Sequence, residues 1–357
     1  MLKQGDKSAV QKTFSVNLKR MAASLLPFVM ALPHLSFASA LDESEQNNPK
    51  AWIHLMTEKV RELEFKGHFT YERGFQSSSY QYIHQVVDGQ ERQRLVFMDG
   101  AAQEIINDGT SIKYLHSKDD LQPKLYQAEV GQLLNVRKDF SHVWRLYDGV
   151  MLKDNRVAGR EVKCIHLKPK DKHRYSYVFA IDEQTGLMLK MMVIDNKSRV
   201  LERYRYVQIE YTDITDADLM AGLEEVETVE QEITLSETGV KLAAETIKDF
   251  SFADMQLQLN WKPEGFQSKV EPLEENHAVQ HTYSDGLSSF SVFIEAVDDA
   301  ANTLPSSKGS SWRNGGTAVA TKFIKSQSNS GELLQATVVG ELPMATVKRI
   351  VDHIAVQ

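Results

Sequence analysis

Residues 173–190, HRYSYVFAIDEQTGLMLK, carry the pattern that decides the fold class of this chain. Side chains alternate between the two faces of an extended strand, so every second residue shares a face. A stripe of rings on one face is typical of a strand that packs against a hydrophobic core. A strongly curved sheet with a helix on its concave side could instead hold an acyl chain among these rings, and both interpretations stay open. The residues of the stripe are Tyr175, Tyr177, Phe179 and Ile181.

The same alternation continues on both sides of this stretch. Asp-Gly pairs at 88–89, 99–100 and 108–109 supply the positive-φ conformers that tight hairpin turns need. We therefore predict a meander of antiparallel strands followed by a second strand group. The alternating runs are GHFTYERG (67–74), YQYIHQVV (80–87), RQRLVFM (92–98), EIIN (104–107), SIKYLHS (111–117), KLYQAEV (124–130), EVKCIHLKP (161–169), LMLKMMVID (187–195) and LERYRYVQIEY (201–211).

Two stretches change to a helical period. Residues 51–65, AWIHLMTEKVRELEF, place Trp52 and other apolar residues at helical spacing. Residues 132–147 gather a second apolar stripe that includes Trp144. We predict two helices, the second of which lies across the sheet.

The first forty residues differ from the rest of the chain. A basic leader is followed by a mostly apolar run at 22–32 and by Ala38-Ser39-Ala40, which has the small-x-small form that signal peptidase accepts. We predict that residues 1–40 are a signal peptide. The alternatives are a disordered cytoplasmic extension and a later start at Met21. Removal of this segment takes away five basic residues and one acidic residue, so the net charge falls from −8 to −12.

The mature chain divides into three parts by composition. Residues 41–212 form the strand-rich N-terminal domain, and residues 213–249 are acidic and poor in aromatics, as expected of an exposed connector. Residues 250–357 are enough for a smaller C-terminal α+β domain. The acidic balance lacks the basic face that neutralises phosphates, so we expect no nucleic-acid partner.

The C-terminal domain shows its own turn and helix signals. In YSDGLSSFSVFI (283–294), Asp285-Gly286 predicts a turn and the alternation after it predicts a half-buried strand. The Gly/Ser-rich run SSKGSSWRNGG (306–316) indicates a mobile surface loop rather than a phosphate cradle, because the Lys-Ser/Thr of such a cradle is missing. Pro343 opens a last amphipathic helix.

Motifs that carry enzyme chemistry are missing from the sequence. There is no G-x-S-x-G elbow, no Walker loop, no dinucleotide fingerprint and no H-E-x-x-H. His277 and His281 have the i, i+4 spacing of metal ligands, but their surroundings predict a strand and no third ligand is evident. The single cysteine, Cys164, lies in a strand-like run and is expected to be structural. We expect no catalytic residues, no metal and no cofactor.

Several segments together resemble one protein family. They are RVAGREVKCIHLKPKD, HRYSYVFAIDEQTGLMLK and NKSRVLERYRY in 156–206, with WKPEGF, YSDGLSSFSVFI and VVGELPMATVKRI further on. In order and combination they resemble the RseB/MucB family, the periplasmic negative regulators of sigma-E type envelope-stress responses. The resemblance runs over about residues 50–357.

The resemblance implies a fold, a partner and a regulatory ligand. It implies a LolA/LolB-like antiparallel half-barrel with helices on its concave face, followed by a smaller C-terminal α+β domain. It implies binding to the periplasmic region of a membrane anti-sigma factor (RseA or MucA), protection of that factor from site-1 proteolysis, and release by lipopolysaccharide or another lipid. It also allows a homodimer. The rival function is that of a LolA-like periplasmic carrier of acylated lipoproteins, because an apolar concave face suits both.

The two functions are assigned to different residues. We expect the C-terminal domain, with its exposed turns and capped helix, to bind the anti-sigma factor, and we expect aromatic positions of the N-terminal domain to bind lipid. The candidates for partner binding are Tyr283, Asp285 and Phe290. The candidates for lipid binding are Phe69, Tyr71, Phe97 and Trp144.

Overall fold

The computed structural model of this chain describes eight stretches of the sequence. The predicted signal peptide lies almost wholly outside them, as does most of the predicted connector. Within the described stretches, no helix combines the length and the apolar character needed to cross a membrane. The described residues are 39–117, 140–220, 228–234, 257–268, 273–275, 278–296, 309–325 and 333–356.

Helix α1 (Pro49–Glu62) forms where the sequence predicts the first helix. The Asn48 side chain caps it by accepting a hydrogen bond from the backbone N–H of Lys50 at 3.0 Å, and a proline occupies its first position. The helix ends where Leu63 turns to an extended conformation. One side of the helix faces the core, and the residues buried there are Trp52, Ile53, Leu55 and Met56.

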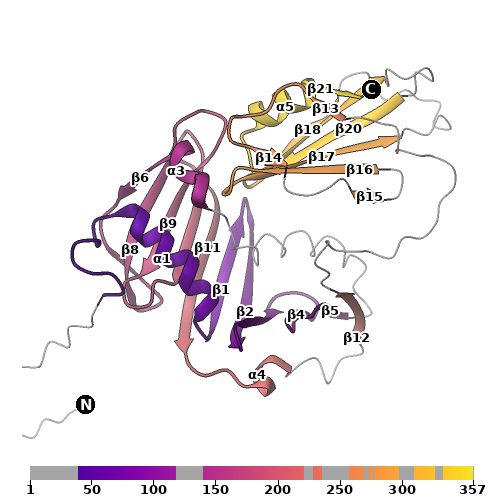
Figure 1. The fold of residues 1–357 in the computed structure, drawn as a ribbon. Helices are drawn as coiled ribbons and strands as arrows, with labels where there is room; N and C mark the ends of the chain where they lie inside the picture. Colours follow the sequence, from indigo (N-terminus) through magenta and orange to yellow (C-terminus); the bar gives the residue numbers. More distant parts are fainter. Residues whose placement is uncertain are drawn as a thin grey trace, which may run out of the picture. The chain divides into compact units, whose positions relative to one another are not determined.

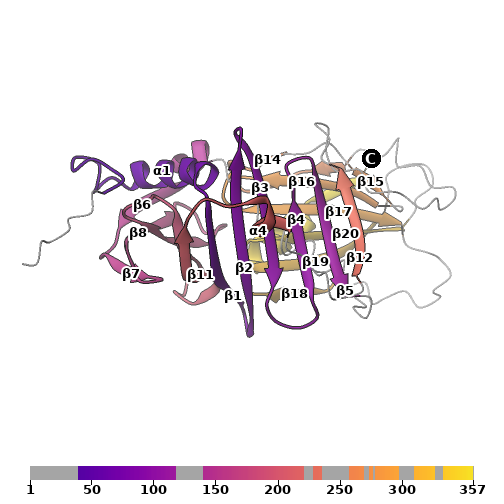
Figure 2. The ribbon, with the colours of Figure 1, turned by 90° about the horizontal axis from the view of Figure 1, so that it is seen from below.

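A 12-stranded antiparallel sheet makes up most of the N-terminal domain (Figures 1 and 2). Its order is β12-β5-β4-β3-β2-β1-β11-β10-β9-β8-β6, with β7 paired to β8, so among the described residues β12 and β6 are the outermost strands and the sheet is open. The strands are β1 (Phe65–Arg73), β2 (Gln76–Val87), β3 (Gln90–Phe97), β4 (Gln103–Asn107), β5 (Ser111–Ser117), β6 (Tyr147–Met151), β7 (Asn155–Val157), β8 (Arg160–Pro169), β9 (Ser176–Asp182), β10 (Met188–Ile194), β11 (Val200–Tyr211) and β12 (Thr228–Thr234).

The core of this domain lies between α1 and the strands β8 and β9 (Figure 1). The ring stripe of the opening stretch points into it: Tyr177 and Ile181 are 0 % exposed and belong to the same cluster as Trp52 of α1. The interpretation of the stripe as core is therefore confirmed. Leu146 of the short helix α3 (Val143–Leu146) packs into this cluster as well.

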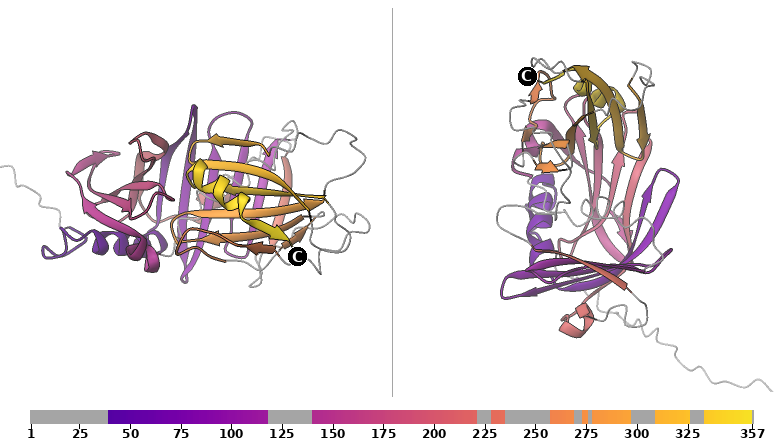
Figure 3. Two further views of the ribbon diagram at one scale, coloured as in Figure 1. Left: turned by 90° about the horizontal axis from the view of Figure 1, so that it is seen from above. Right: turned by 90° about the vertical axis from the view of Figure 1, so that its right-hand side faces the viewer.

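The C-terminal domain is a smaller sheet covered by one helix (Figure 3). Its strand order is β14-β16-β17-β20-β19-β18, with β15 paired to β16 and a separate β13–β21 pair. Helix α5 (Met344–Asp352) packs on β19 and β20. The predicted fold class, α+β with an open antiparallel sheet and a smaller C-terminal domain, is thus confirmed. The strands are β13 (Leu257–Leu259), β14 (Gln267–Ser268), β15 (Leu273–Glu275), β16 (Ala278–Ser284), β17 (Ser289–Ala296), β18 (Ser311–Asn314), β19 (Thr317–Lys325), β20 (Leu333–Gly340) and β21 (Ile354–Val356).

Three local predictions need correction. Of the predicted helix at 132–147, the described residues form only the 3-10 turn η1 (Phe140–His142) and α3, because Tyr147 already pairs in β6. The predicted loop at 306–316 contains strand β18, which pairs with β19. The predicted connector contains helix α4 (Asp216–Met220) and strand β12, which pairs with β5 of the large sheet.

Candidate functional site

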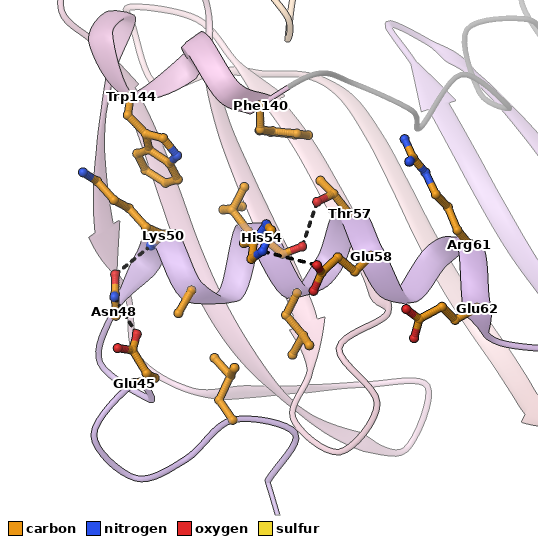
Figure 4. Close-up of a pocket in the computed structure, with 14 residues that line it drawn as sticks. Glu45, Asn48, Lys50, His54, Thr57, Glu58, Arg61, Glu62, Phe140 and Trp144 are labelled. Carbon is orange, nitrogen blue, oxygen red and sulfur yellow. Dashed lines mark hydrogen bonds and ion pairs between the residues drawn. The ribbon is translucent and has the colours of Figure 1, made fainter.

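A groove of about 1080 Å³ runs along the outer side of α1 (Figure 4). The segment 140–146 forms its other wall, and the rings of Phe140 and Trp144 point from that segment toward the helix. This volume is at the upper end of the range for small-molecule sites. The groove is apolar at Phe140, Trp144 and Leu55. Its rim is mixed in charge, with the basic side chains Lys50, His54 and Arg61 beside the acidic side chains Glu45, Glu58 and Glu62.

Several polar groups of the groove already have partners within α1. The Thr57 hydroxyl donates to the backbone carbonyl of His54 at 2.7 Å, so it is not aligned with the imidazole as a nucleophile would be. The imidazole itself faces Glu58, with 3.3 Å between Nε2 and Oε1. The Lys50 ammonium lies 5.6 Å from the centre of the Trp144 ring, within the range of a cation–π contact. The apolar wall at Phe140 and Trp144 suits an acyl chain, while the mixed charges of the rim select no particular sign of head group.

The structure separates the four predicted lipid-binding residues into two places. Trp144 is half-buried and lines the groove. The other three lie on β1 and β3, outside the groove lining. Phe69 stacks on Tyr80 with ring centres 4.9 Å apart, and Phe97 meets Tyr80 edge-on at 5.0 Å. Phe69, Tyr71, Tyr80 and Phe97 belong to one packed cluster, which we call the ring cluster.

Tyr71 supports a contact between the two domains. Its hydroxyl donates to Oε2 of Glu202 at 2.6 Å, and the backbone N–H of Gly316 in the C-terminal domain donates to Oε1 of the same carboxylate at 2.8 Å. Arg73 Nε lies 3.6 Å from that oxygen and balances its charge. Burial, together with the neighbouring Glu202 carboxylate, raises the pKa of Tyr71 far above its ordinary value, so the hydroxyl stays a donor.

Two of the three predicted partner-binding residues are interior. Phe290 is 1 % exposed and belongs to the core of the C-terminal domain, because alternate residues of β17 face the helix α5. Asp285 is 2 % exposed. Tyr283 is half-buried and stacks on Phe290 at 4.9 Å between ring centres. Neither Phe290 nor Asp285 therefore offers its side chain to a partner in this conformation.

Asp285 instead forms a buried ion pair with the N-terminal domain. Its Oδ2 accepts from Arg174 Nε at 2.6 Å, and both side chains are 0 % exposed. Its Oδ1 accepts from the backbone N–H groups of Leu287 and Ser288, which confirms the predicted turn. Arg174 also donates to Asp171 and to the backbone carbonyl of Glu264. Every charged atom of the pair thus has a partner, as a buried pair requires.

Further contacts surround this ion pair and complete what we call the domain junction. Leu287, which follows the turn in the C-terminal domain, packs into the core cluster of the N-terminal domain. The Tyr177 hydroxyl and the Ser288 hydroxyl are 2.9 Å apart and buried. The Tyr175 hydroxyl donates to the backbone carbonyl of Leu342 at 2.9 Å. The stripe that decides the fold therefore also carries the contact between domains.

Arg174, Leu287 and Glu202 are residues whose importance the sequence pattern does not reveal. Arg174 sits just before a strand, where a charged residue is ordinarily exposed. The sequence offers two signals for this contact. Arg174 stands beside the ring stripe, and the acidic residue Asp285 stands in a distant turn. Nothing local connects the two, since 111 positions separate them.

The metal and cysteine predictions concern residues away from these sites. His281 lies in β16, so the predicted extended conformation is confirmed, while His277 falls outside the described residues. Among the residues that the structure describes, no group of His, Cys, Asp and Glu is placed to hold a metal ion. Cys164 is buried in β8, and burial raises the pKa of its thiol. A raised pKa disfavours the reactive thiolate.

We expect Cys164→Ala to lower the free energy of unfolding by about 1 kcal/mol and to leave partner binding unchanged, because the side chain only fills core space. Chemical denaturation and a binding titration of the same variant check this. Loss of binding by a variant that remains folded would contradict the structural role.

Two family models match this chain. The model of the MucB/RseB N-terminal domain matches residues 48–234, and the model of the MucB/RseB C-terminal domain matches residues 251–355. The first alone spans more than half of the chain. Its end at residue 234 coincides with the end of β12, the edge strand of the large sheet.

Curated proteins and solved structures agree with these matches. The sigma factor AlgU regulatory protein MucB of Pseudomonas aeruginosa is 30 % identical over 338 residues, which are 91 % of this chain and 94 % of that protein. The sigma-E factor regulatory protein RseB of Haemophilus influenzae is 27 % identical and covers 88 % of this chain and 94 % of its own length. The structure of the MucA/MucB complex from Pseudomonas aeruginosa has a chain that is similar with a TM-score of 0.63 and 27 % identity, covering 86 % of this chain and 98 % of its own length.

Proposed function

This chain belongs to the MucB/RseB family, and from that premise we propose that it is a periplasmic regulator that binds the periplasmic region of a transmembrane anti-sigma factor. The observation that carries the proposal is the likeness, over nearly the whole chain, to a MucB that was solved in complex with MucA. Export through the signal peptide at 1–40 is part of the proposal.

The proposed mechanism is competition for one peptide segment. While the regulator is bound, the site-1 protease cannot reach the anti-sigma factor, which therefore keeps its sigma factor inactive. A lipid ligand releases the regulator only if it binds better to a state that holds the peptide poorly. Such a mechanism needs binding surfaces and a movable element, and it needs no catalytic group.

The C-terminal domain is proposed as the principal docking surface. Among the three candidates, only the partly exposed ring of Tyr283 can contact a partner directly. Asp285 and Phe290 act indirectly, since the first holds the domain junction and the second holds the sheet that presents the surface. A variant at either position is therefore expected to change binding through stability or domain position.

The groove along α1 is proposed as the place where an acylated ligand, such as lipopolysaccharide, is sensed. Its apolar wall at Phe140 and Trp144 can pack along an acyl chain. On a rim that also carries three glutamates, Lys50 and Arg61 are the groups that can face a phosphate. The ring cluster of Phe69, which the sequence also suggested for lipid, is already packed by protein rings.

We expect Trp144→Ala to raise the lipid concentration needed for half-maximal release of the anti-sigma peptide by about tenfold, since the lost ring contact is worth about 1.4 kcal/mol. Fluorescence anisotropy of a labelled peptide, with detergent-dispersed lipopolysaccharide as competitor, measures the shift. Trp312→Ala is the matched control, because Trp312 is 57 % exposed on β18 and is not part of the groove. Equal curves for Trp144→Ala and the unmodified chain would contradict the assignment.

A carrier of acylated lipoproteins is the second candidate, and the groove volume is the observation that favours it. Affinity purification of the tagged mature chain from envelope extracts separates the two functions. Recovery of one transmembrane anti-sigma factor supports regulation. Recovery of assorted lipoproteins without that factor would overturn the proposed function.

A further inference from the structure

The two domains meet at two places that differ in construction. The domain junction joins the segment before and within β9 to the turn after β16. A second contact joins the turn between β18 and β19 to Glu202 at the start of β11. The two places lie on different strands of each sheet, so one contact can open while the other holds.

The domain junction is built to persist. Arg174 and Asp285 are both fully buried there, and breaking a buried pair is strongly destabilising even though Asp171 remains beside Arg174. Leu287 adds an apolar side chain of one domain to the core of the other. The guanidinium of Arg174 also lies 5.1 Å from the centre of the Phe266 ring. Separation at this point would expose charge and apolar surface together.

The Glu202 contact is built from hydrogen bonds and glycines. The Gly316 N–H donates to Glu202, and the exposed Asn314 amide donates to Gln76 Oε1 at 3.3 Å. A Cβ at Gly316 would lie 3.1 Å from Glu202 Oε1, and a Cβ at Gly315 would lie 2.4 Å from Arg73 Cγ. Two glycines therefore let the backbone of the turn approach this closely. When the contact opens, Glu202 keeps Tyr71 and Arg73 as partners, so its charge is not orphaned.

We propose that the Gly316–Glu202 contact is a releasable latch and that the domain junction is the fixed pivot about which the C-terminal domain turns. Opening exchanges the hydrogen bonds of Gly316 and Asn314, and that of Arg313 on β18 with Tyr175, for bonds to water, and leaves the buried ion pair intact. The latch opens rather than the domain junction because less free energy is needed to break the latch contact. Tyr71 connects the latch to the ring cluster of the N-terminal domain, so packing changes in that cluster bear directly on the latch carboxylate.

Two pairs of spin labels on the full mature chain test the proposal, in a Cys164→Ser background. One pair, Ser77→Cys with Ser311→Cys, uses exposed positions on β2 and β18 near the latch, and the other, Lys172→Cys with Lys262→Cys, uses exposed positions near the pivot. In Gly316→Ala we expect the latch pair to show an additional population whose distance between the two labels is longer by more than about 2 Å. The pivot pair should keep the distance that it has in the chain with Gly316.

The matched control is Thr317→Ala, which changes the next residue, the first of β19, and removes a hydroxyl that has no hydrogen-bond partner among the described residues. It should leave both distances unchanged. An unchanged latch distance in Gly316→Ala, or an equal change at both pairs, would overturn the proposal. Hydrogen exchange of the unmodified chain gives a readout that does not depend on the variant folding: the peptide around Gly316 should exchange faster than the peptide around Leu287. The reverse order would also overturn it.

Discussion

Asp285→Ala is expected to lower the free energy of unfolding by about 3 kcal/mol, because it removes the fully buried counterion of Arg174 and leaves the partly exposed Asp171 as the remaining carboxylate partner. The same change removes the acceptor for the backbone N–H groups of Leu287 and Ser288, which adds to the loss. Urea denaturation followed by circular dichroism measures the effect.

The matched control is Asp216→Ala. Asp216 pairs with Arg92 at 3.1 Å, but its side chain is 76 % exposed, so the loss should stay within about 1 kcal/mol. Asp285→Asn separates the two roles of Asp285, because the amide oxygen can still accept from the turn while the charge is gone. If Asp285→Ala and Asp216→Ala were equally stable, the ion pair would not hold the domains together.

Phe290→Ala is expected to lower the free energy of unfolding by about 3–5 kcal/mol, because it removes the core contacts of a buried ring. Phe290 is 1 % exposed, and its ring lies 5.2 Å from the Phe266 ring. Its Cβ packs closely on the neighbouring strand because Gly340 there has no side chain. The anti-sigma peptide should then bind normally to whatever fraction of the variant remains folded. Denaturant titrations with and without the peptide measure both quantities.

Phe75→Ala is the control for this prediction, since the Phe75 side chain is fully exposed and its loss should change stability by less than about 0.5 kcal/mol. A Phe290→Ala protein that is as stable as the unmodified chain but fails to bind the peptide would show that Phe290 contacts the partner directly. The two variants thus distinguish a core ring from a contact ring.

The alternation of apolar and polar residues was enough to predict most of the strands of the large sheet. Tyr177 and Ile181 lie on the face of β9 that packs against α1, and the apolar stripe that they form is visible in the local sequence, although Ala180 on the other face is buried as well. Helix α1 was predictable for the same reason, with Asn48 and a proline marking its start. The C-terminal helix α5 follows the same logic.

The contacts between domains could not be predicted because each half looks ordinary by itself. Asp285-Gly286 is explained completely by the turn that it forms, so nothing in the turn predicts a contact with Arg174. Phe290 follows that turn with the spacing of a strand that is exposed on one face, and only the position of α5 decides which face is buried. The glycine and serine residues that dominate 306–316 predict a loop, whereas β18 is specified by its pairing with β19.

The groove illustrates a different limit. Trp144 was identified from an apolar helical stripe, but the groove exists because this ring faces α1 from a segment that lies some 90 residues further along the chain. Lys50 and Arg61, two of the charged residues on the rim of the groove, have no local pattern that separates them from other residues of α1. Tertiary packing alone brings these groups together.

The central claim, that this chain shields an anti-sigma factor, is tested most directly by protease protection. The chain from Leu41 onward is mixed with the periplasmic segment of the anti-sigma factor, and the rate of site-1 cleavage is followed by gel. With the chain at 100 times its dissociation constant, cleavage should slow about a hundredfold, because only the unbound segment is cut. Cleavage at the same rate with and without the chain would contradict the account.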